Sequence, residues 1–396
     1  MRTSTLRRLH VMGSGTAAAL VVLLAAPRPV AAQIANGSTA ALGMGENYMA
    51  VARGLDAVAW NPAGLGLFGT GSSSWVAMVA RGGTGIGPVT LGDLADWSNE
   101  RVPAPVKRAW LARIAADGGE SGSADADVTW FGLQFGRFAV HASTSVRTQA
   151  ALAPGIAELL LFGNVGESGE AQAVTLSGSS GVATAHSAIG ASWAMPLPTG
   201  DGGCAAVGLT VKYVVGHALA VGDNSTGNTT VEPISVLFGF PTLHSTSEGD
   251  SFDGNGGAGL GLDLGLGWDT PGGWSFGLAV QNVVNTFDWD PGELSFSPLH
   301  VHLDSDTAYT ETDEVPASQA PASLRTRVDD LTFRPVLSAG AAYRVSDQLM
   351  VAGDARLTSD TGIRMGAARH VGAGLEYRPV PWLPIHAGGA AISSGR

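Results

Sequence analysis

The strongest constraint in this sequence is the alternation of large apolar residues with glycine or polar residues. Leucine or tryptophan occupies every second position from Leu260 to Trp268, and glycine or aspartate fills the positions between them. A turn sequence follows at residues 269–272, and the alternation resumes at residues 274–281. Because successive side chains of a strand point to opposite faces, the pattern predicts a hairpin with one apolar face and one face of small or polar residues.

The same alternation recurs along the chain. Clear candidate strands begin near Ser72, Asp127, Phe138, Thr184, Ala205, Ala258, Trp274, Pro335, Leu349, His370 and Leu383. Weaker candidates lie near Gly83, Val231 and Leu294. The sequence therefore predicts about 12 to 14 strands.

Two architectures produce such strands. In a soluble sandwich the apolar faces pack against each other, whereas in an outer-membrane barrel they face lipid. The segments have the length of about ten residues that a tilted spanning strand needs, and aromatic residues stand at strand ends: Trp268, Trp274, Tyr343, Tyr377 and Trp382. We expect an all-β fold, an antiparallel transmembrane β-barrel of about 14 strands with Leu260, Leu262, Leu264 and Leu266 outside. A soluble periplasmic β protein is the alternative.

Two short segments have a helical rather than a strand pattern. Val106, Trp110 and Ile114 recur every fourth residue after two prolines, and residues 156–162 form an apolar run between Pro154 and Gly163. The spacing predicts two short loop helices.

The first 32 residues have the pattern of a secretory signal peptide. Arginines precede an apolar run at residues 11–26, and small residues at 30–32 mark a cleavage site. Cleavage would remove four arginines and no acidic residue, so the formal net charge would change from −12 to −16. An exported acidic chain with Cys204 as its one cysteine fits the outer membrane of a Gram-negative bacterium, and the acidic charge argues against a nucleic-acid partner.

Residues 33–68 precede the first strand and are rich in small residues. They contain Gly43 and Gly45, then Asp56, then the turn-forming run Asn61-Pro62-Ala63-Gly64. This segment resembles the N-terminal hatch of the FadL-type outer-membrane transporters, which share a glycine pair, a small-residue stretch with an aspartate, and an Asn-Pro-Ala element. The resemblance implies a hatch at 33–68 inside a barrel formed by 69–396, with Gly43, Gly45, Asp56, Asn61, Pro62, Ala63 and Gly64 as hatch or ligand residues.

The resemblance also implies a function. FadL-type proteins are plugged channels that take up long-chain fatty acids or aromatic hydrocarbons, so the expected partners are outer-membrane lipid and a hydrophobic small molecule. The wider group includes PorV-like barrels, which serve protein secretion, so the alternative is a non-transporting scaffold that binds secretion-apparatus proteins. We find no basic pair that matches a fatty-acid carboxylate site. An apolar pocket beside residues 61–68 would favour transport, and a filled lumen would favour the scaffold.

Charged residues recur on the small or polar strand faces and are expected to face the lumen. They are Arg147, Lys212, Asp263, Arg344, Asp354, Arg356, Glu376 and Arg378. Charges of both signs in a closed barrel could pair and hold a hatch in place, or they could simply hydrate the interior.

The sequence predicts no catalytic residues, no cofactor and no metal site, and hence no enzyme. His300 and His302 could share a strand face beyond which Asp304 and Asp306 lie, but no third ligand has a suitable spacing for zinc. The last strand lacks the terminal aromatic residue on which barrels usually close, so we expect a truncated C-terminal end.

Overall fold

The computed structural model describes residues 38–393, apart from 164–165, 169–172, 176, 201, 225–226, 232–233, 246–255, 305–307, 312, 360 and 364–366. The predicted signal peptide, residues 33–37 of the predicted hatch and the last three residues lie outside this range. Among the described residues, no helix is both long and apolar enough to cross a bilayer.

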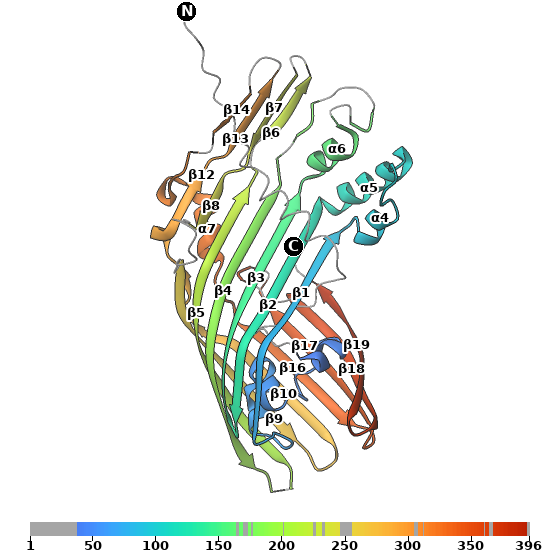
Figure 1. The fold of residues 1–396 in the computed structure, drawn as a ribbon, viewed down its shortest axis with the longest axis vertical. Helices are drawn as coiled ribbons and strands as arrows, with labels where there is room; N and C mark the ends of the chain where they lie inside the picture. Colours follow the sequence, from blue (N-terminus) through green and yellow to red (C-terminus); the bar gives the residue numbers. More distant parts are fainter. Residues whose placement is uncertain are drawn as a thin grey trace, which may run out of the picture.

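One curved antiparallel sheet dominates the molecule (Figure 1). Its main path contains eleven strands, each hydrogen-bonded to the next: β1 (Ser73–Gly87), β2 (Glu120–Phe135), β3 (Phe138–Leu152), β4 (Ser180–Pro198), β5 (Cys204–Asp223), β9 (Gly257–Asp269), β10 (Trp274–Asn285), β16 (Val336–Arg344), β17 (Leu349–Thr358), β18 (Arg369–Val380) and β19 (Leu383–Ser393). Each clear candidate strand of the sequence corresponds to one of these, which confirms the all-β antiparallel fold.

The weaker strand candidates have different outcomes. Gly83 does not begin a strand of its own, because β1 runs through it and pairs with β2 from Ser73 to Gly87. Val231 ends β6 (Gly227–Val231), and Leu294 begins β12 (Leu294–Ser297). Both of these strands are short and lie outside the main path.

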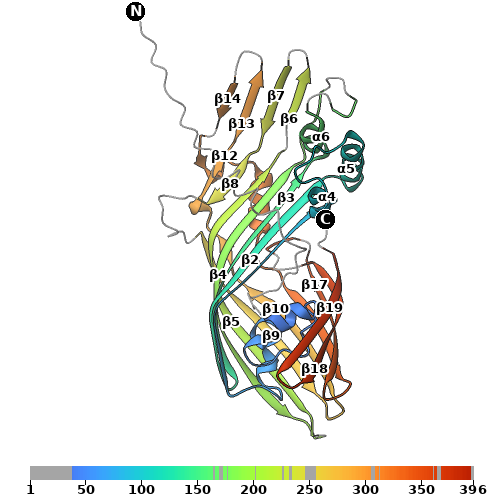
Figure 2. The same ribbon diagram turned by 45° about the vertical axis from the view of Figure 1, so that its right-hand side comes forward.

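Short strands extend the fold at one end of the sheet. β8 (Thr242–Ser245), β11 (Asp288–Trp289), β12 and β15 (Val315–Pro316) attach to the main sheet and bring it to 15 strands. A second, four-stranded sheet contains β6, β7 (Ile234–Gly239), β13 (His300–Asp304) and β14 (Ala308–Glu311). Figures 1 and 2 place it at the same end as helices α4 to α6.

The two predicted loop helices are present. They are α5 (Ala104–Asp117), which ends at Gly118 in a left-handed conformation, and α6 (Pro154–Phe162). The sequence pattern did not predict α4 (Leu91–Ala95) or α7 (Ala322–Asp330). Val89, Trp110, Ile114 and Ala157 form a small apolar core that joins α5 to α6.

The two ends of the sheet differ in the length of their connections. Short turns at 136–137, 199–203, 270–273, 345–348 and 381–382 join strands at one end, and long connections at 88–119, 153–179, 224–256, 286–335 and 359–368 join them at the other. Outer-membrane barrels have short periplasmic turns and longer extracellular loops. We refer to the two as the short-turn end and the long-loop end.

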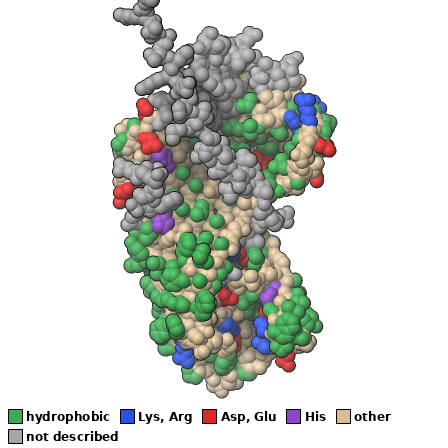
Figure 3. All heavy atoms as spheres, in the orientation of Figure 1, with side chains coloured by type: hydrophobic (Ala, Val, Ile, Leu, Met, Phe, Trp, Pro, Cys, Tyr) green, Lys and Arg blue, Asp and Glu red, His purple; other side chains and the backbone are tan. Residues whose placement is uncertain are grey.

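Large apolar side chains cover the outer face of the sheet. Leu260, Leu264 and Leu266 are 51, 44 and 51% exposed, whereas Asp263 between them is 1% exposed. Figure 3 shows hydrophobic side chains spread over the wall of long strands. The leucines therefore do not fill a core between two sheets, which excludes the sandwich architecture.

The sheet has two free edges within the described residues. β1 pairs with β2 alone and β19 pairs with β18 alone. Figure 2 shows the sheet curling so that β16 to β19 lie opposite β2 to β5.

The outward leucines give a test of which medium they face. Replacing Leu264, near the middle of β9, with arginine should lower the free energy of unfolding in lipid bilayers by about 2–4 kcal/mol, because a charge would then lie near the bilayer midplane. The control Leu264→Met keeps the volume and should change stability by less than ~1.5 kcal/mol. Reversible urea unfolding in vesicles measures both, and equal stability of the two variants would show that this face does not contact lipid.

Candidate functional site

The described part of the N-terminal segment, residues 38–68, lies inside the curve of the sheet near the short-turn end (Figures 1 and 2). It contains α2 (Thr39–Gly43), η1 (Gly54–Asp56), α3 (Ala57–Trp60) and η2 (Pro62–Leu65). Much of it is buried, including Met44, Ala57 and Ala63, each at 0% exposure. We call these residues the inner segment.

Asp56 organises the inner segment internally. Its carboxylate accepts hydrogen bonds from the hydroxyls of Ser38 at 2.9 Å and Tyr48 at 3.5 Å. Ser38 also caps α2 by accepting from the amide of Ala41. Burial raises the pKa of the Tyr48 hydroxyl, and the nearby Asp56 carboxylate adds to this rise, so Tyr48 remains a neutral donor.

Asn61 both begins η2 and binds the wall of the sheet. Its side-chain oxygen accepts from the amide of Ala63 at 3.1 Å, and its side-chain nitrogen donates to the carbonyl of Leu266 on β9 at 2.8 Å. Pro62 occupies the first position of η2, where the missing amide hydrogen leaves no unsatisfied donor. At Gly64 a β-carbon would overlap the carbonyl of Ala52, so the chain can pass there only without a side chain.

Glycines on the inner face of the sheet let the inner segment approach closely. A β-carbon on Gly277 of β10 would lie 2.7 Å from the carbonyl oxygen of Met49, and one on Gly374 of β18 would lie 2.6 Å from that of Met44. Side chains at Gly208, Gly265, Gly340 and Gly388 would also overlap the segment. The small faces predicted from the alternation are therefore the surface on which the segment lies.

The glycine pair Gly43 and Gly45 lies against β19. A β-carbon on Gly43 would lie 2.7 Å from the β-carbon of His386, and one on Gly45 would lie 2.6 Å from the amide nitrogen of Gly389. Gly45 also has a φ of 63°, in the left-handed region. Any side chain at these two positions would push the segment away from the wall.

Glu46 of the inner segment lies between two arginines from opposite parts of the wall. Its carboxylate is 3.1 Å from Arg81 of β1 and 3.7 Å from Arg356 of β17, and it is 1% exposed. Burial raises the pKa of Glu46, and the two guanidinium groups oppose that rise. Breaking a buried ion pair by removing one partner costs about 3–5 kcal/mol, so this contact holds the segment to both sides of the curved sheet.

Further ion pairs connect Arg81 to the neighbouring strands β2 and β3. Arg81 also pairs with Asp127 of β2 at 3.1 Å, and Asp127 pairs with Arg147 of β3 at 2.7 Å. The hydroxyl of Ser145 donates to the same carboxylate at 2.7 Å. Asp127 is thus a buried acceptor for three donors.

The remaining predicted lumen charges have separate partners. Lys212 of β5 pairs with Asp263 of β9 at 2.8 Å. Asp354 of β17 accepts from the backbone amide of Met49 in the inner segment at 2.8 Å, and the Arg356 guanidinium lies 5.2 Å from the ring of Trp60. The structure therefore brings Asp354 and Arg356 to the segment, whereas Lys212 and Asp263 bind each other.

Arg344, Glu376 and Arg378 lie farther toward the short-turn end. Glu376 pairs with Arg378 at 2.7 Å and with His386 at 3.0 Å. Arg344, Glu376 and Arg378 line a cavity of about 510 Å³, together with Tyr48, Arg53, Phe68 and Asp269. The cavity beside Phe68 is therefore rich in charges, not the apolar pocket that would favour transport.

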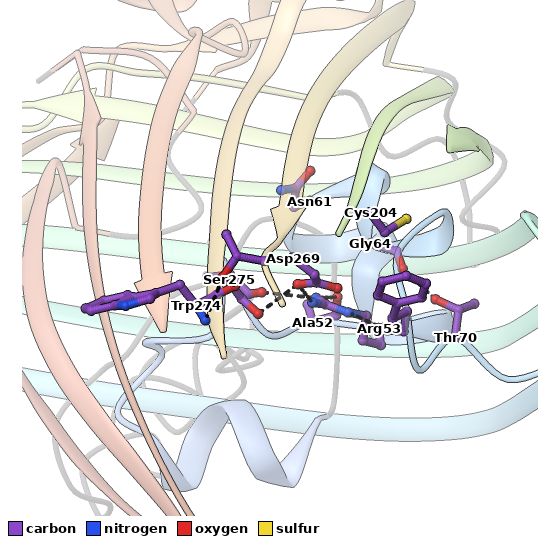
Figure 4. A network of polar contacts seen from close by, with 12 residues as sticks. Ala52, Arg53, Asn61, Gly64, Thr70, Cys204, Asp269, Trp274 and Ser275 are labelled. Atoms are coloured by element: carbon purple, nitrogen blue, oxygen red, sulfur yellow. Dashed lines mark hydrogen bonds and ion pairs between the residues drawn. The ribbon is translucent and has the colours of Figure 1, made fainter. Parts of the chain in front are cut away.

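A second contact fixes the inner segment at this end (Figure 4). The Arg53 guanidinium lies 2.7 Å from the Asp269 carboxylate at the end of β9, and the Ser275 hydroxyl donates to the same carboxylate at 2.7 Å. Arg53 also donates to the carbonyls of Ala50 and Ala52. The Arg53 side chain therefore binds the backbone of its own segment and also attaches that segment to the sheet.

Sequence reasoning did not identify several of these residues: Glu46, Arg53, Arg81, Asp127 and Asp269. Asp127 alternates with Ala126 and Val128 as other inward residues do, so the period-two pattern could have placed it on the inner face. Arg81 has the parity of the outward Trp75, and it points inward because the pairing of β1 with β2 is interrupted at Met78. Their partners depend on strand register and on the position of the inner segment, which local pattern does not give.

Among the residues that the structure describes, no three histidine, cysteine, aspartate or glutamate side chains gather as a metal site would require. His300 and His302 lie on β13 of the second sheet.

Comparisons with known proteins give likeness of fold alone. No family model matches the chain, and no curated protein matches it. A crystal structure of the toluene transporter TbuX of Ralstonia pickettii aligns with 13% identity and a TM-score of 0.46, covering 90% of this chain and 86% of that chain. The toluene transporter TodX of Pseudomonas putida aligns with 13% identity and a TM-score of 0.32, covering 89% and 90%.

Two adjacent glycines of β19 test how the inner segment is held. A β-carbon on Gly388 would overlap the backbone of Met44, whereas one on Gly389 would meet nothing within 4 Å. Gly388→Ala should therefore displace residues 43–49 and speed hydrogen exchange at the amide of Met49 by at least about tenfold, whereas Gly389→Ala should leave it unchanged. Equal exchange in both variants would show that the close approach does not hold the segment.

Proposed function

We propose that this chain is an outer-membrane channel for uptake of hydrophobic small molecules, with the inner segment as its plug and the long loops outside the cell. The observation that carries the proposal is the binding of residues 38–68 to the inner face of the sheet. That face belongs to strands whose opposite face is apolar enough for lipid. A substance that enters from the long-loop end must pass this segment.

The contacts of the segment suit a plug that can move. Its polar attachments to the wall include Glu46 with Arg81 and Arg356, Arg53 with Asp269, Met49 with Asp354, Asn47 with His370 and Gly389, Asn61 with Leu266, and the Gln281 side chain with the carbonyl of Ala59. Apolar side chains of the segment, among them Met44, Met49 and Trp60, pack on alanines of the wall. Such a segment can shift without unpairing a strand of the sheet.

The long-loop end offers apolar surfaces to an entering molecule. A cavity of about 850 Å³ lies between β8, β12 and α7, with Leu243, Trp289, Leu294 and Val328 as apolar lining residues and Glu314, Arg325 and Asp329 as charged ones. Ligand pockets are typically lined by hydrophobic and aromatic side chains with a few polar groups. The alternative of a secretion scaffold requires no such cavity, and the charged cavity beside Phe68 is compatible with that alternative.

Deleting residues 35–68 tests the plug. The barrel should still fold and insert, because the deletion removes no strand, and liposome swelling in small sugars should become several times faster. Cys204, now buried against Gly66 and Leu67, should react with a membrane-impermeant maleimide in the deletion variant and be protected in the full chain. A Cys204→Ser chain is the labelling blank.

Swelling at the wild-type rate in a correctly inserted deletion variant would contradict the plug. Uptake itself is tested in cells that express the full chain, by accumulation of a labelled aromatic hydrocarbon relative to cells with the empty vector. Equal accumulation, together with capture of a secretion component, would favour the scaffold.

A further inference from the structure

A second cavity at the long-loop end has a distinct chemical character. It measures about 450 Å³ and lies between helices α4, α5 and α6 and the ends of β1, β2 and β3. Its volume is within the range of small-molecule sites, about 300–1,000 Å³. Aliphatic and aromatic side chains form most of its lining: Ile86, Val89, Leu94, Trp110, Ile114, Leu152, Ala157, Leu160 and Leu161.

Among the described residues, no basic side chain lines this cavity. The three cations of α5 point to other partners: Lys107 donates to the carbonyl of Leu161 at 2.5 Å, Arg108 pairs with Glu167 at 3.7 Å, and Arg113 pairs with Asp93 at 2.9 Å. A carboxylate ligand would therefore find no counter-charge and would lose its hydration.

One carboxylate, that of Glu120, lines the cavity, and one of its two oxygens has no hydrogen-bond partner among the described residues. Glu120, at the start of β2, accepts from the amide of Val89 at 3.1 Å through Oε2. Its Oε1 is buried and has no hydrogen-bond partner among the described residues. A buried acceptor without a donor is costly, and an apolar ligand that carries one hydroxyl would supply that donor.

We infer that this cavity binds a neutral, mainly apolar molecule with a single hydroxyl group, a phenol or an apolar alcohol, through a hydrogen bond to Oε1 of Glu120. The ring or chain of the ligand contacts Trp110, Ile114 and Leu160, and the hydroxyl lies at the β2 end of the cavity. The inference rests on the proposed function in that it names the substrate class that an uptake channel would bind at its outer end.

Three ligands with the same naphthalene ring system test it: 2-naphthol, naphthalene and 2-naphthoate, titrated into the detergent-solubilised full chain by calorimetry. 2-Naphthol should bind about tenfold or more tighter than naphthalene, as a hydrogen bond to a charged group gives, and 2-naphthoate should bind weakest. Glu120→Leu should abolish the preference for 2-naphthol and keep naphthalene binding. Ala157→Trp, which fills the cavity, should abolish binding of all three.

Arg108→Gln is the matched control, because Arg108 lies on the exposed side of α5. This substitution should leave every affinity unchanged. A heat-modifiable gel shift reports that each variant is folded. Equal affinity for 2-naphthol and naphthalene, tightest binding of 2-naphthoate, or unchanged binding in folded Ala157→Trp would each overturn the inference. Binding as expected without uptake in cells would instead overturn the proposed function and leave the binding site standing.

Discussion

The glycine positions on the inner face of the sheet are the constraint on which the rest of the structure depends. Gly277, Gly340 and Gly374 stand where any β-carbon would overlap the backbone of the inner segment or its contacts. The same strands carry leucine, valine and aromatic side chains on their outer face. One period-two pattern therefore makes an apolar outer wall and, on the other side, a surface smooth enough for a second backbone to lie on.

That close approach creates a need for polar partners. A backbone that leaves water must have its amides and carbonyls hydrogen-bonded, and the inner segment has only short helical turns of its own. The wall supplies part of what is missing: the Asp354 carboxylate binds the amide of Met49, and the Gln281 side chain binds the carbonyl of Ala59. Side chains from the segment supply more, as Asn61 does for the carbonyl of Leu266. Hydrogen bonds are thus donated both from the segment to the wall and from the wall to the segment, and together they fix the register of the segment on the sheet.

The buried charges add specificity rather than a large gain in stability. Taking an ion pair out of water costs about as much as the pair returns, but leaving one member unpaired costs several kcal/mol. Arg81 illustrates this specificity, because it meets both Glu46 of the inner segment and Asp127 of β2 at 3.1 Å. Glu46 also lies 3.7 Å from Arg356, so the segment is bound to β1 and to β17 at one defined position.

Most of the wall could be predicted from the sequence, and the site only in part. The alternation at residues 258–281 is local, so it gave the strands, their apolar face and the order of the hairpins. The motif at Asn61 and Pro62 gave a turn, and the structure places a 3-10 helix there. The partners of Glu46 could not be found, because Arg81 and Arg356 are 35 and more than 300 residues away and come from strands that meet only when the sheet curls.

Two of the cavities in the molecule differ in how many charged residues line them. At the short-turn end, the cavity beside Phe68 is lined by Arg53, Asp269, Arg344, Glu376 and Arg378. At the long-loop end, the cavity under α5 has Glu120 as its one charged lining residue. An apolar molecule is stabilised by the second environment and not by the first, since burial away from water is what favours it. Under the proposed uptake function, an apolar molecule would therefore bind at the long-loop end rather than in the charged cavity, and passage to the short-turn end would require movement of the inner segment.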